Sequence, residues 1–256
     1  MRGNYISEKS VIDMHDHKGS LDKYAWHVTH AENRAALDAA YIHGLITWVR
    51  FQTNQEYKTI LDVPCGNGRL HPWLKKLGYE VEGLDRSEEM VAEARENGRN
   101  CWIGNMADPE AYSAKKYDII LNWFTSFGYL SEEENERTLQ IWSEHVRPGG
   151  LLIMDLATPH KDPFSGFARY DNNIVEIMEE ESEDNVRHIH IKLYRDEGDK
   201  LVKLRENNVD LHMYTPEEIA ALLEKNGFQL LKMFGRYEFR SPRKDAHAIV
   251  YLATKI

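Results

Sequence analysis

The sequence has only two cysteines, no long hydrophobic run, and fewer basic than acidic residues. Cys65 and Cys101 are too few to build a disulfide framework in a chain of 256 residues. The longest apolar runs, such as residues 44–49, fall far short of the ~20 residues that cross a bilayer. Residues 1–10 lack the apolar segment of a signal peptide. These absences predict a soluble, cytoplasmic protein from a reducing compartment, with no membrane association.

The charge balance restricts the partners that the chain can attract. There are 32 basic and 42 acidic residues, which gives a net charge of −10. A surface of this sign repels a phosphate backbone at long range, so a nucleic-acid partner is disfavoured. The length suits a single domain, because one hydrophobic core stops growing near roughly 250–300 residues.

From residue 58 onward, short apolar runs alternate with stretches of helical spacing. The expected strands are residues 59–63, 80–84, 100–104, 117–122 and 150–155, and the expected helices between them are residues 68–77, 87–97 and 131–146. Continuously apolar strands separated by helices are typical of a parallel sheet that is covered on both faces. The pattern therefore predicts a doubly wound, Rossmann-like α/β fold, preceded by a helix over residues 31–53.

The pattern changes after Asp155. Residues 187–194 alternate strictly between polar and apolar, a turn follows at residues 196–199, and residues 201–211 resemble a second strand. This predicts an antiparallel hairpin with one buried face. The acidic residues 179–184 are interpreted as a solvated turn. A helix over residues 216–225, with Thr215 as its N-cap, and strands over residues 228–234 and 246–254 complete the chain.

One string carries most of the chemical information. Asp62 ends a buried strand, and Gly66 and Gly68 then allow a tight turn that a ligand can approach closely. Asp85 ends the next strand, where a carboxylate can accept hydrogen bonds from both hydroxyls of a ribose. The third glycine of the dinucleotide-binding fingerprint is missing, and the Asp62 carboxylate would repel a pyrophosphate. A nucleoside that bears an amine and a sulfonium fits better than a dinucleotide, so a dehydrogenase is disfavoured.

Four motifs in the same order resemble class I S-adenosylmethionine-dependent methyltransferases. They are Asp62-x-x-Cys65-Gly66-x-Gly68 with Asp85, then residues 104–108, residues 117–129, and Arg147-Pro148-Gly149-Gly150. Pro64 departs from the family pattern, which has Gly or Ala at this point. The resemblance implies a mostly parallel seven-stranded sheet with an antiparallel last strand, a β insertion after the fifth strand and an N-terminal helical lid. It divides one domain into residues 1–57 (lid), 58–158 (cofactor-binding half), 159–212 (β insertion and substrate cap) and 213–256 (C-terminal helix and last two strands).

The resemblance also implies S-adenosyl-L-methionine as the cofactor and a role for each matching residue. The methionine part would contact the backbone of Pro64, Gly66 and Gly68, the Asp62 carboxylate, and Asn122 with Trp123. The ribose would bind Asp85, and the adenine would lie among Arg86, Met90, Asn105 and Met106. For Asn105, a purely local role in the turn stays open. Cys65 is expected to be a packed side chain and not a nucleophile.

The expected reaction is methyl transfer to a nitrogen or oxygen of a small molecule, as in glycine and amino-sugar N-methyltransferases, which the layout resembles. Tyr129 and His160 are the candidates for substrate contact or general base. Two alternatives stay open, namely a methyltransferase acting on protein or tRNA and a non-catalytic cofactor-binding scaffold. The strand motif of adenine-N6 methyltransferases is absent. The oligomeric state is open, with a homodimer among the options.

Twelve histidines raise the question of a metal site. His188 and His190 share one face of a strand, but no spacing fixes further ligands around them. We expect this pair to form a polar sheet face, and we expect no metal.

Overall fold

The computed structural model describes residues 26–159, 164–169 and 173–256, with side chains described from Arg34 onward. The chain divides into two compact units. The larger unit contains residues 31–159 and 213–256, and the smaller unit contains residues 1–30 and 160–212. Residues 1–25 of the predicted lid lie outside the described residues, and residues 26–53 of it form a helix.

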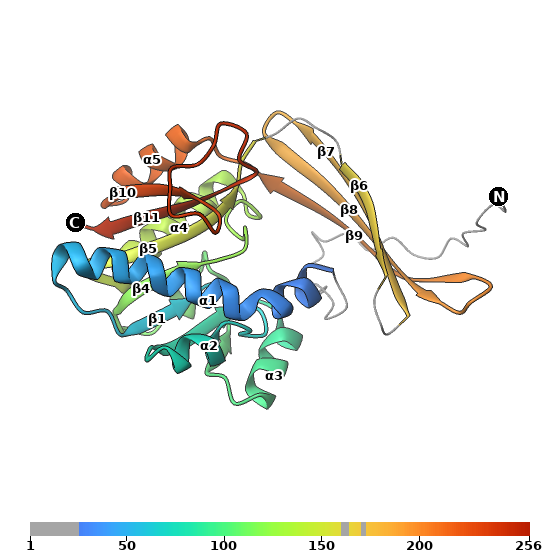
Figure 1. The fold of residues 1–256 in the computed structure, drawn as a ribbon, viewed down its shortest axis with the longest axis horizontal. Coiled ribbons are helices and arrows are strands. Elements are labelled where there is room, and N and C mark those ends of the chain that lie inside the picture. Colours follow the sequence, from blue (N-terminus) through green and yellow to red (C-terminus); the bar gives the residue numbers. More distant parts are fainter. Residues whose placement is uncertain (1–25, 160–163, 170–172) are drawn as a thin grey trace. The chain divides into compact units, whose positions relative to one another are not determined.

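The larger unit is built on a seven-stranded sheet (Figure 1). Its strands are β1 Thr59–Asp62, β2 Glu80–Asp85, β3 Cys101–Ile103, β4 Tyr117–Asn122, β5 Val146–Ala157, β10 Phe228–Gly235 and β11 Ala248–Lys255. They lie in the order β10-β11-β5-β4-β1-β2-β3. The pairs around β1, β2 and β4 are parallel, whereas β11 runs antiparallel to both β5 and β10. The predicted doubly wound sheet with an antiparallel last strand is confirmed.

Helices cover both faces of this sheet. They are α1 Trp26–Thr53, α2 His71–Lys76, α3 Glu88–Glu96, α4 Glu132–His145 and α5 Pro216–Lys225, together with a short 3-10 turn, η1 Pro109–Ala111. The predicted N-cap Thr215 starts α5 in a capping box with Glu218, and Ser131 does the same for α4 with Glu134. The starts of α4 and α5 therefore have a local sequence cause.

Alternation along the strands divides the core into two layers. Ile60 and Ile119 point toward α1 and α2 and join a cluster that includes Leu45 and Leu74. The adjacent residues, such as Leu61, point the other way and pack with side chains of α4 and α5. Both faces are buried, which explains why these strands are continuously apolar in the sequence. The carboxyl ends of β1, β2 and β4 meet along one edge, where ligands bind in sheets of this type.

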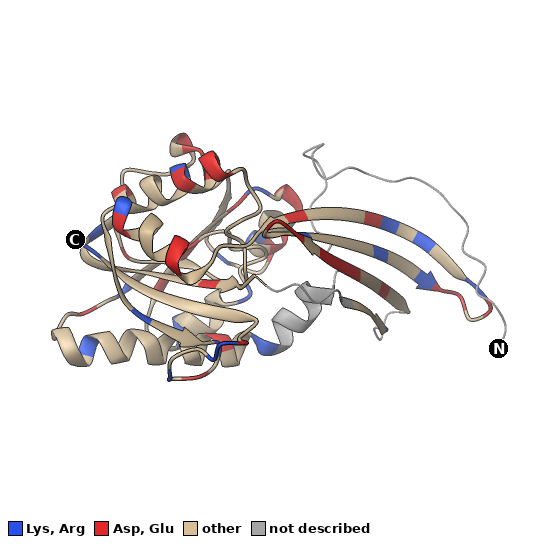
Figure 2. Ribbon diagram, turned by 90° about the horizontal axis from the view of Figure 1, so that it is seen from above, with Lys and Arg blue, Asp and Glu red and all other residues tan. Residues whose placement is uncertain are grey.

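The smaller unit is a four-stranded antiparallel sheet in the order β6-β7-β8-β9. Its strands are β6 Phe164–Arg169, β7 Ile174–Glu183, β8 Val186–Asp196 and β9 Leu201–His212. The predicted hairpin corresponds to β8 and β9, which pair along almost their full length. Both acidic and basic residues lie along these strands (Figure 2).

One local prediction is wrong. Most of the acidic segment 179–184 belongs to β7, and only Asp184 and Asn185 form the turn, with φ angles of 47° and 63°. Cross-strand partners explain the difference, because Glu179 pairs with Lys192 at 2.9 Å and Glu180 with Arg187 at 3.7 Å. Opposite charges on neighbouring strands stabilise a sheet, so acidic residues alone do not indicate a turn.

Among the described helices, none combines the length and the apolar character that crossing a membrane would require.

Candidate functional site

The loop between β1 and α2 turns on two glycines in the left-handed region. Gly66 has φ of 55° and Gly68 has φ of 71°, a conformation that side chains disfavour. A Cβ atom on Gly66 would meet no atom within 4 Å, so this part of the backbone borders open space. The Val63–Pro64 peptide bond before the turn is cis. The predicted glycine elbow is therefore present, with an open side that a ligand can approach.

Asp85 links this loop to the end of β2. Its carboxylate accepts the Gly66 N–H at 2.7 Å and the Ser87 N–H at 2.9 Å. Burial raises the pKa of Asp85, and the two N–H donors oppose that effect. Each carboxylate oxygen has more than one acceptor site. Asp85 can therefore hold the loop and still accept hydrogen bonds from a ribose.

A second group of acceptors lies at the ends of β1 and β4. The Asn122 side-chain amide donates to the carbonyl of Val63 at 2.8 Å, while its Oδ1 atom is buried without a hydrogen-bond partner among the described residues. Asp62 ends β1 and is 3 % exposed. An unpartnered buried acceptor is costly unless a ligand satisfies it. An ammonium group bound here would supply the missing donor.

These features fit S-adenosyl-L-methionine, the cofactor that the motifs imply. The ammonium would be held by Asp62 and Asn122, and the ribose hydroxyls by Asp85. The backbone of Gly66 and Gly68 would face the part of the cofactor between the ammonium and the ribose, because glycine has no side chain to block its approach. The fit rests on the unpartnered Asn122 oxygen and on the open space beside Gly66.

The residues assigned to the adenine follow β2 and β3. Met90 and Met106 are buried, whereas Arg86 and Asn105 are exposed. The Asn105 side chain accepts the Ala107 N–H at 3.1 Å, which is a local turn contact. This contact agrees with a purely local role of Asn105 in the turn. A contact between Asn105 and the adenine base stays a prediction.

The remaining candidates lie after β4. Trp123 is buried and packs on Tyr41 of α1, with 6.1 Å between the ring centroids, and its indole N–H has no hydrogen-bond partner among the described residues. Tyr129 lies in the loop before α4 and is 37 % exposed. His160 lies outside the described residues.

Sequence reasoning missed an anchor for the loop after β4. Phe124 and Thr125 have φ angles of 72° and 57°, and consecutive non-glycine residues rarely adopt this region. Asp155, at the end of β5, accepts the Phe124 N–H at 3.2 Å through its side chain and the Thr125 N–H at 2.8 Å through its carbonyl. Arg236 pairs with Asp155 at 2.7 Å and donates to the Thr125 hydroxyl at 3.2 Å. These contacts hold the strained loop in one conformation.

A second buried acid, Asp38 of α1, also went unrecognised. It pairs with Arg69 of the glycine loop at 2.5 Å and accepts the Tyr237 hydroxyl. The Arg69 guanidinium in turn lies 5.4 Å from the ring centre of Phe124. The only sequence signal was a single acid within an apolar stretch, since its partners lie far away in the chain.

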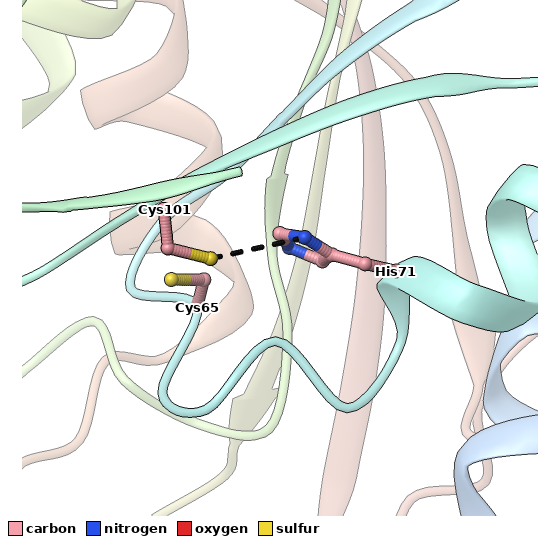
Figure 3. Close-up of side chains that lie close together, drawn as sticks. All are labelled: Cys65, His71 and Cys101. Atoms are coloured by element: carbon pink, nitrogen blue, oxygen red, sulfur yellow. Dashed lines mark hydrogen bonds between the residues drawn. The ribbon is translucent and has the colours of Figure 1, made fainter. Parts of the chain in front are cut away.

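Behind the glycine loop lies a buried group of Cys65, His71 and Cys101 (Figure 3). Nε2 of His71 lies 3.3 Å from Oδ2 of Asp62, without hydrogen-bond alignment. Burial lowers the pKa of His71, but Asp62 and Cys101 outweigh it and raise that pKa to about 9. The proximity of the two thiols lowers the pKa of Cys101 and raises that of Cys65, and burial raises both. Cys65 is packed as expected, but the sequence did not predict that His71 and Cys101 lie beside it.

The smaller unit carries a polar groove of about 680 Å³ on its own sheet, lined in part by Glu179, His188, His190 and Asp210. His188 pairs with Asp210 at 2.7 Å, and His190 pairs with Glu206. This is the polar sheet face that was expected for the two histidines.

Comparisons with known proteins agree with the site. Residues 60–150 match a family described as a methyltransferase domain. A Geobacillus sp. (strain WCH70) protein described as a candidate methyltransferase is 28 % identical over 218 residues, which are 78 % of this chain and 86 % of that protein. The dTDP-3-amino-3,4,6-trideoxy-alpha-D-glucopyranose N,N-dimethyltransferase of Streptomyces venezuelae is 31 % identical over 121 residues, 46 % of this chain and 49 % of that enzyme.

Solved structures share the fold over nearly the whole chain. The sugar N-methyltransferase of Streptoalloteichus sp. matches with a TM-score of 0.75 and 15 % identity, covering 99 % of both chains. An S-adenosylmethionine-dependent methyltransferase of Clostridium acetobutylicum matches with a TM-score of 0.73 and 20 % identity, covering 90 % of this chain and 96 % of that one. Residues 60–150 are thus similar to a methyltransferase domain, and the chain has the fold of the class I enzymes. The predicted resemblance to that class is confirmed, and with it S-adenosyl-L-methionine as the expected cofactor.

Proposed function

We propose that the chain is an S-adenosylmethionine-dependent methyltransferase that acts on a nitrogen or oxygen of a small molecule. The observation that carries this proposal is the pairing of Asp85 with the Gly66 N–H at 2.7 Å, next to the unpartnered Asn122 oxygen. Together these groups offer acceptors for a ribose and for an ammonium along one sheet edge. A dinucleotide would instead place a pyrophosphate beside Asp62.

The contribution of this chain is mainly positioning. When bound, the cofactor supplies an electrophilic methyl group on a sulfonium. Asp62, Asn122 and Asp85 hold polar groups in place, and the loop 123–125 is fixed by Asp155 and Arg236 at the end of β4. Fixed alignment of nucleophile and electrophile provides much of the rate enhancement in such a displacement. An amine acceptor with a modest pKa needs no dedicated base, whereas a hydroxyl acceptor does.

Tyr129 and His160 are our candidates for substrate contact or general base. If they act so, Tyr129→Phe together with His160→Ala lowers turnover by about 100-fold or more, a usual contribution of acid–base groups. Binding of the cofactor, measured by calorimetry, should stay unchanged in the double variant. Turnover equal to that of the unaltered protein would end this assignment.

The preference for a small molecule rests on the net charge of −10 and on the likeness to enzymes named for amino sugars. The test is a labelled-methyl screen in which small molecules, proteins and tRNA from a cell extract are offered separately, with Asp85→Ala as the inactive control. We expect label in the small-molecule fraction. Label in protein or tRNA would overturn the acceptor class. Binding of cofactor with no label in any fraction would favour the scaffold alternative.

A further inference from the structure

Three side chains from separate elements converge behind the glycine loop (Figure 3). Cys65 lies in the loop after β1, His71 is the first residue of α2, and Cys101 is the first residue of β3. One potential ligand atom from each lies within 4.8 Å of the other two. All three side chains are buried, with His71 fully enclosed. Neither the cofactor site nor the proposed reaction gives this cluster a role.

The donor set is that of a site for a soft divalent metal. Thiolates and imidazole are preferred ligands of Zn²⁺, at bond lengths of about 2.0–2.3 Å, which place tetrahedral ligand atoms roughly 3.3–3.8 Å apart. The Nδ1 atom of His71 lies 3.8 Å from the Cys101 sulfur. Small side-chain movements would bring all three donors to bonding distance.

The opposite edge of the imidazole supports this geometry. Nε2 of His71 lies 3.3 Å from the Asp62 carboxylate, close to it but not yet aligned for a hydrogen bond, while Nδ1 contacts the Cys101 sulfur. Metal-binding histidines usually direct their second ring nitrogen at a carboxylate or carbonyl, which fixes the tautomer and the ring orientation. Asp62 would thus position the ring and leave Nδ1 as the ligand atom.

We propose that Cys65, His71 and Cys101 bind a thiophilic divalent metal ion such as Zn²⁺. Binding forms two metal–sulfur bonds and one metal–nitrogen bond, and every proton that the two sulfurs and Nδ1 of His71 carry before binding is released to solvent. Three protein ligands leave one tetrahedral position for water. This inference departs from the expectation of no metal, and it does not depend on the proposed reaction.

A metal at this site would link the glycine loop to β3. The Gly68 N–H donates to the Cys65 carbonyl at 2.8 Å, and the His71 N–H donates to the Gly68 carbonyl at 3.0 Å. A metal that joins Cys65 and His71 to Cys101 would therefore tie both ends of this turn to β3. Because the metal binds the folded chain only, it should raise the thermal unfolding temperature, and above the Kd this rise should follow the logarithm of the free metal concentration.

The test is a Co²⁺ titration of the reduced, metal-free full chain, followed by absorption spectroscopy. We expect thiolate-to-cobalt charge-transfer and visible bands that saturate at one Co²⁺ per chain and vanish when Zn²⁺ is added. Cys101→Ser should remove the charge-transfer band or weaken affinity at least ~100-fold. Asp62→Asn should weaken affinity about 10–100-fold, as expected for a positioning carboxylate.

His188→Gln with His190→Gln is the matched control, because these histidines face carboxylates in the other unit without a thiol. This control should bind Co²⁺ like the unaltered chain. In a second measurement that needs no variant, Zn²⁺ should slow alkylation of both cysteines at least ~10-fold. Bands in Cys101→Ser that appear with the affinity of the unaltered chain, absence of bands in the reduced chain, or unchanged alkylation would each overturn the proposal.

Discussion

Single residues at the cofactor edge are restricted by backbone conformation as much as by side-chain chemistry. Gly68 has φ of 71°, and an added Cβ would also approach the Arg99 side chain at 3.0 Å and the Cys101 sulfur at 3.3 Å. Gly98 has a similar φ of 68°, but a Cβ there would meet nothing within 4 Å. The two glycines therefore separate the conformational effect from the steric one.

We predict that Gly98→Ala lowers the free energy of unfolding by about 1 kcal/mol, the usual effect of a left-handed alanine. Gly68→Ala should lower it by roughly 1–3 kcal/mol more, because the new methyl group is overpacked. Urea denaturation of both variants measures the difference. An equal decrease in the free energy of unfolding for both variants would mean that the steric contacts at Gly68 do not affect stability.

Residue identities could be predicted from the sequence where a local motif required them. Gly66, Gly68 and Asp85 follow from the demands of a tight turn and a ribose, and the structure brings them together. The His71–Cys101 contact could not be predicted, because it depends on β3 lying next to β2 and β2 next to β1. No local pattern in the sequence encodes that adjacency.

At the scale of elements, the loop after β4 depends on β5 and on the segment after β10. Arg236 neutralises Asp155, which is fully buried. Burial raises the pKa of Asp155 and Arg236 opposes that effect. Asp155 and Arg236 lie far apart in the sequence and meet only because β11 lies between β5 and β10. This is why strand positions could be predicted from apolar runs while the anchor could not.

We predict that Arg236→Met lowers the free energy of unfolding by about 3–5 kcal/mol, because it leaves a buried carboxylate unpaired. The double variant Asp155→Asn with Arg236→Met should lose less than the single variant, since no buried charge then lacks a partner. Arg240→Met is the control, because Arg240 is mostly exposed and its loss should matter little. Calorimetric unfolding of the four proteins provides the comparison. A double variant that is less stable than Arg236→Met would contradict this role.

The start of β4 is joined to its neighbours through Asp118. The carboxylate accepts the Lys58 N–H at 2.7 Å and the Thr59 N–H at 2.8 Å, and it pairs with Arg147. Burial raises the pKa of Asp118, but Arg147 and the N–H donors outweigh it and hold that pKa below its usual value. The folded-state pKa is thus depressed. Its stabilising effect is complete above the unfolded pKa and is lost as pH falls through the folded one.

Asp118→Asn should therefore be less stable than the unaltered chain by about 2 kcal/mol near neutral pH. The gap should begin to narrow as pH falls through about 4, the unfolded pKa, and should close only after pH has fallen through the lower folded pKa of Asp118. Urea denaturation across this pH range tests the prediction, with the exposed Glu96→Gln as the control. A gap that stays constant with pH would show that the charge of Asp118 is not the cause.

In the whole molecule, the two units differ in how their strands can be recognised from the sequence. The larger unit has buried, continuously apolar strands, and its order of elements could be predicted in full. In the smaller unit, acidic residues of β7 pair with basic residues of β8. The acidic composition of β7 therefore did not indicate a strand. The chain as a whole carries a net charge of −10, which suits a small acceptor better than a polyanion.

We propose that the glycine loop and Asp85 together bind S-adenosyl-L-methionine. Isothermal titration of the purified full chain with this compound, and with its demethylated product, measures this binding. We predict one site per chain with a Kd of roughly 1–100 µM, weakened at least ~10-fold by Asp85→Ala. Asp108→Asn, which alters an exposed carboxylate in a nearby turn, should leave the Kd unchanged. No binding by the folded chain, or equal binding by Asp85→Ala, would contradict the account.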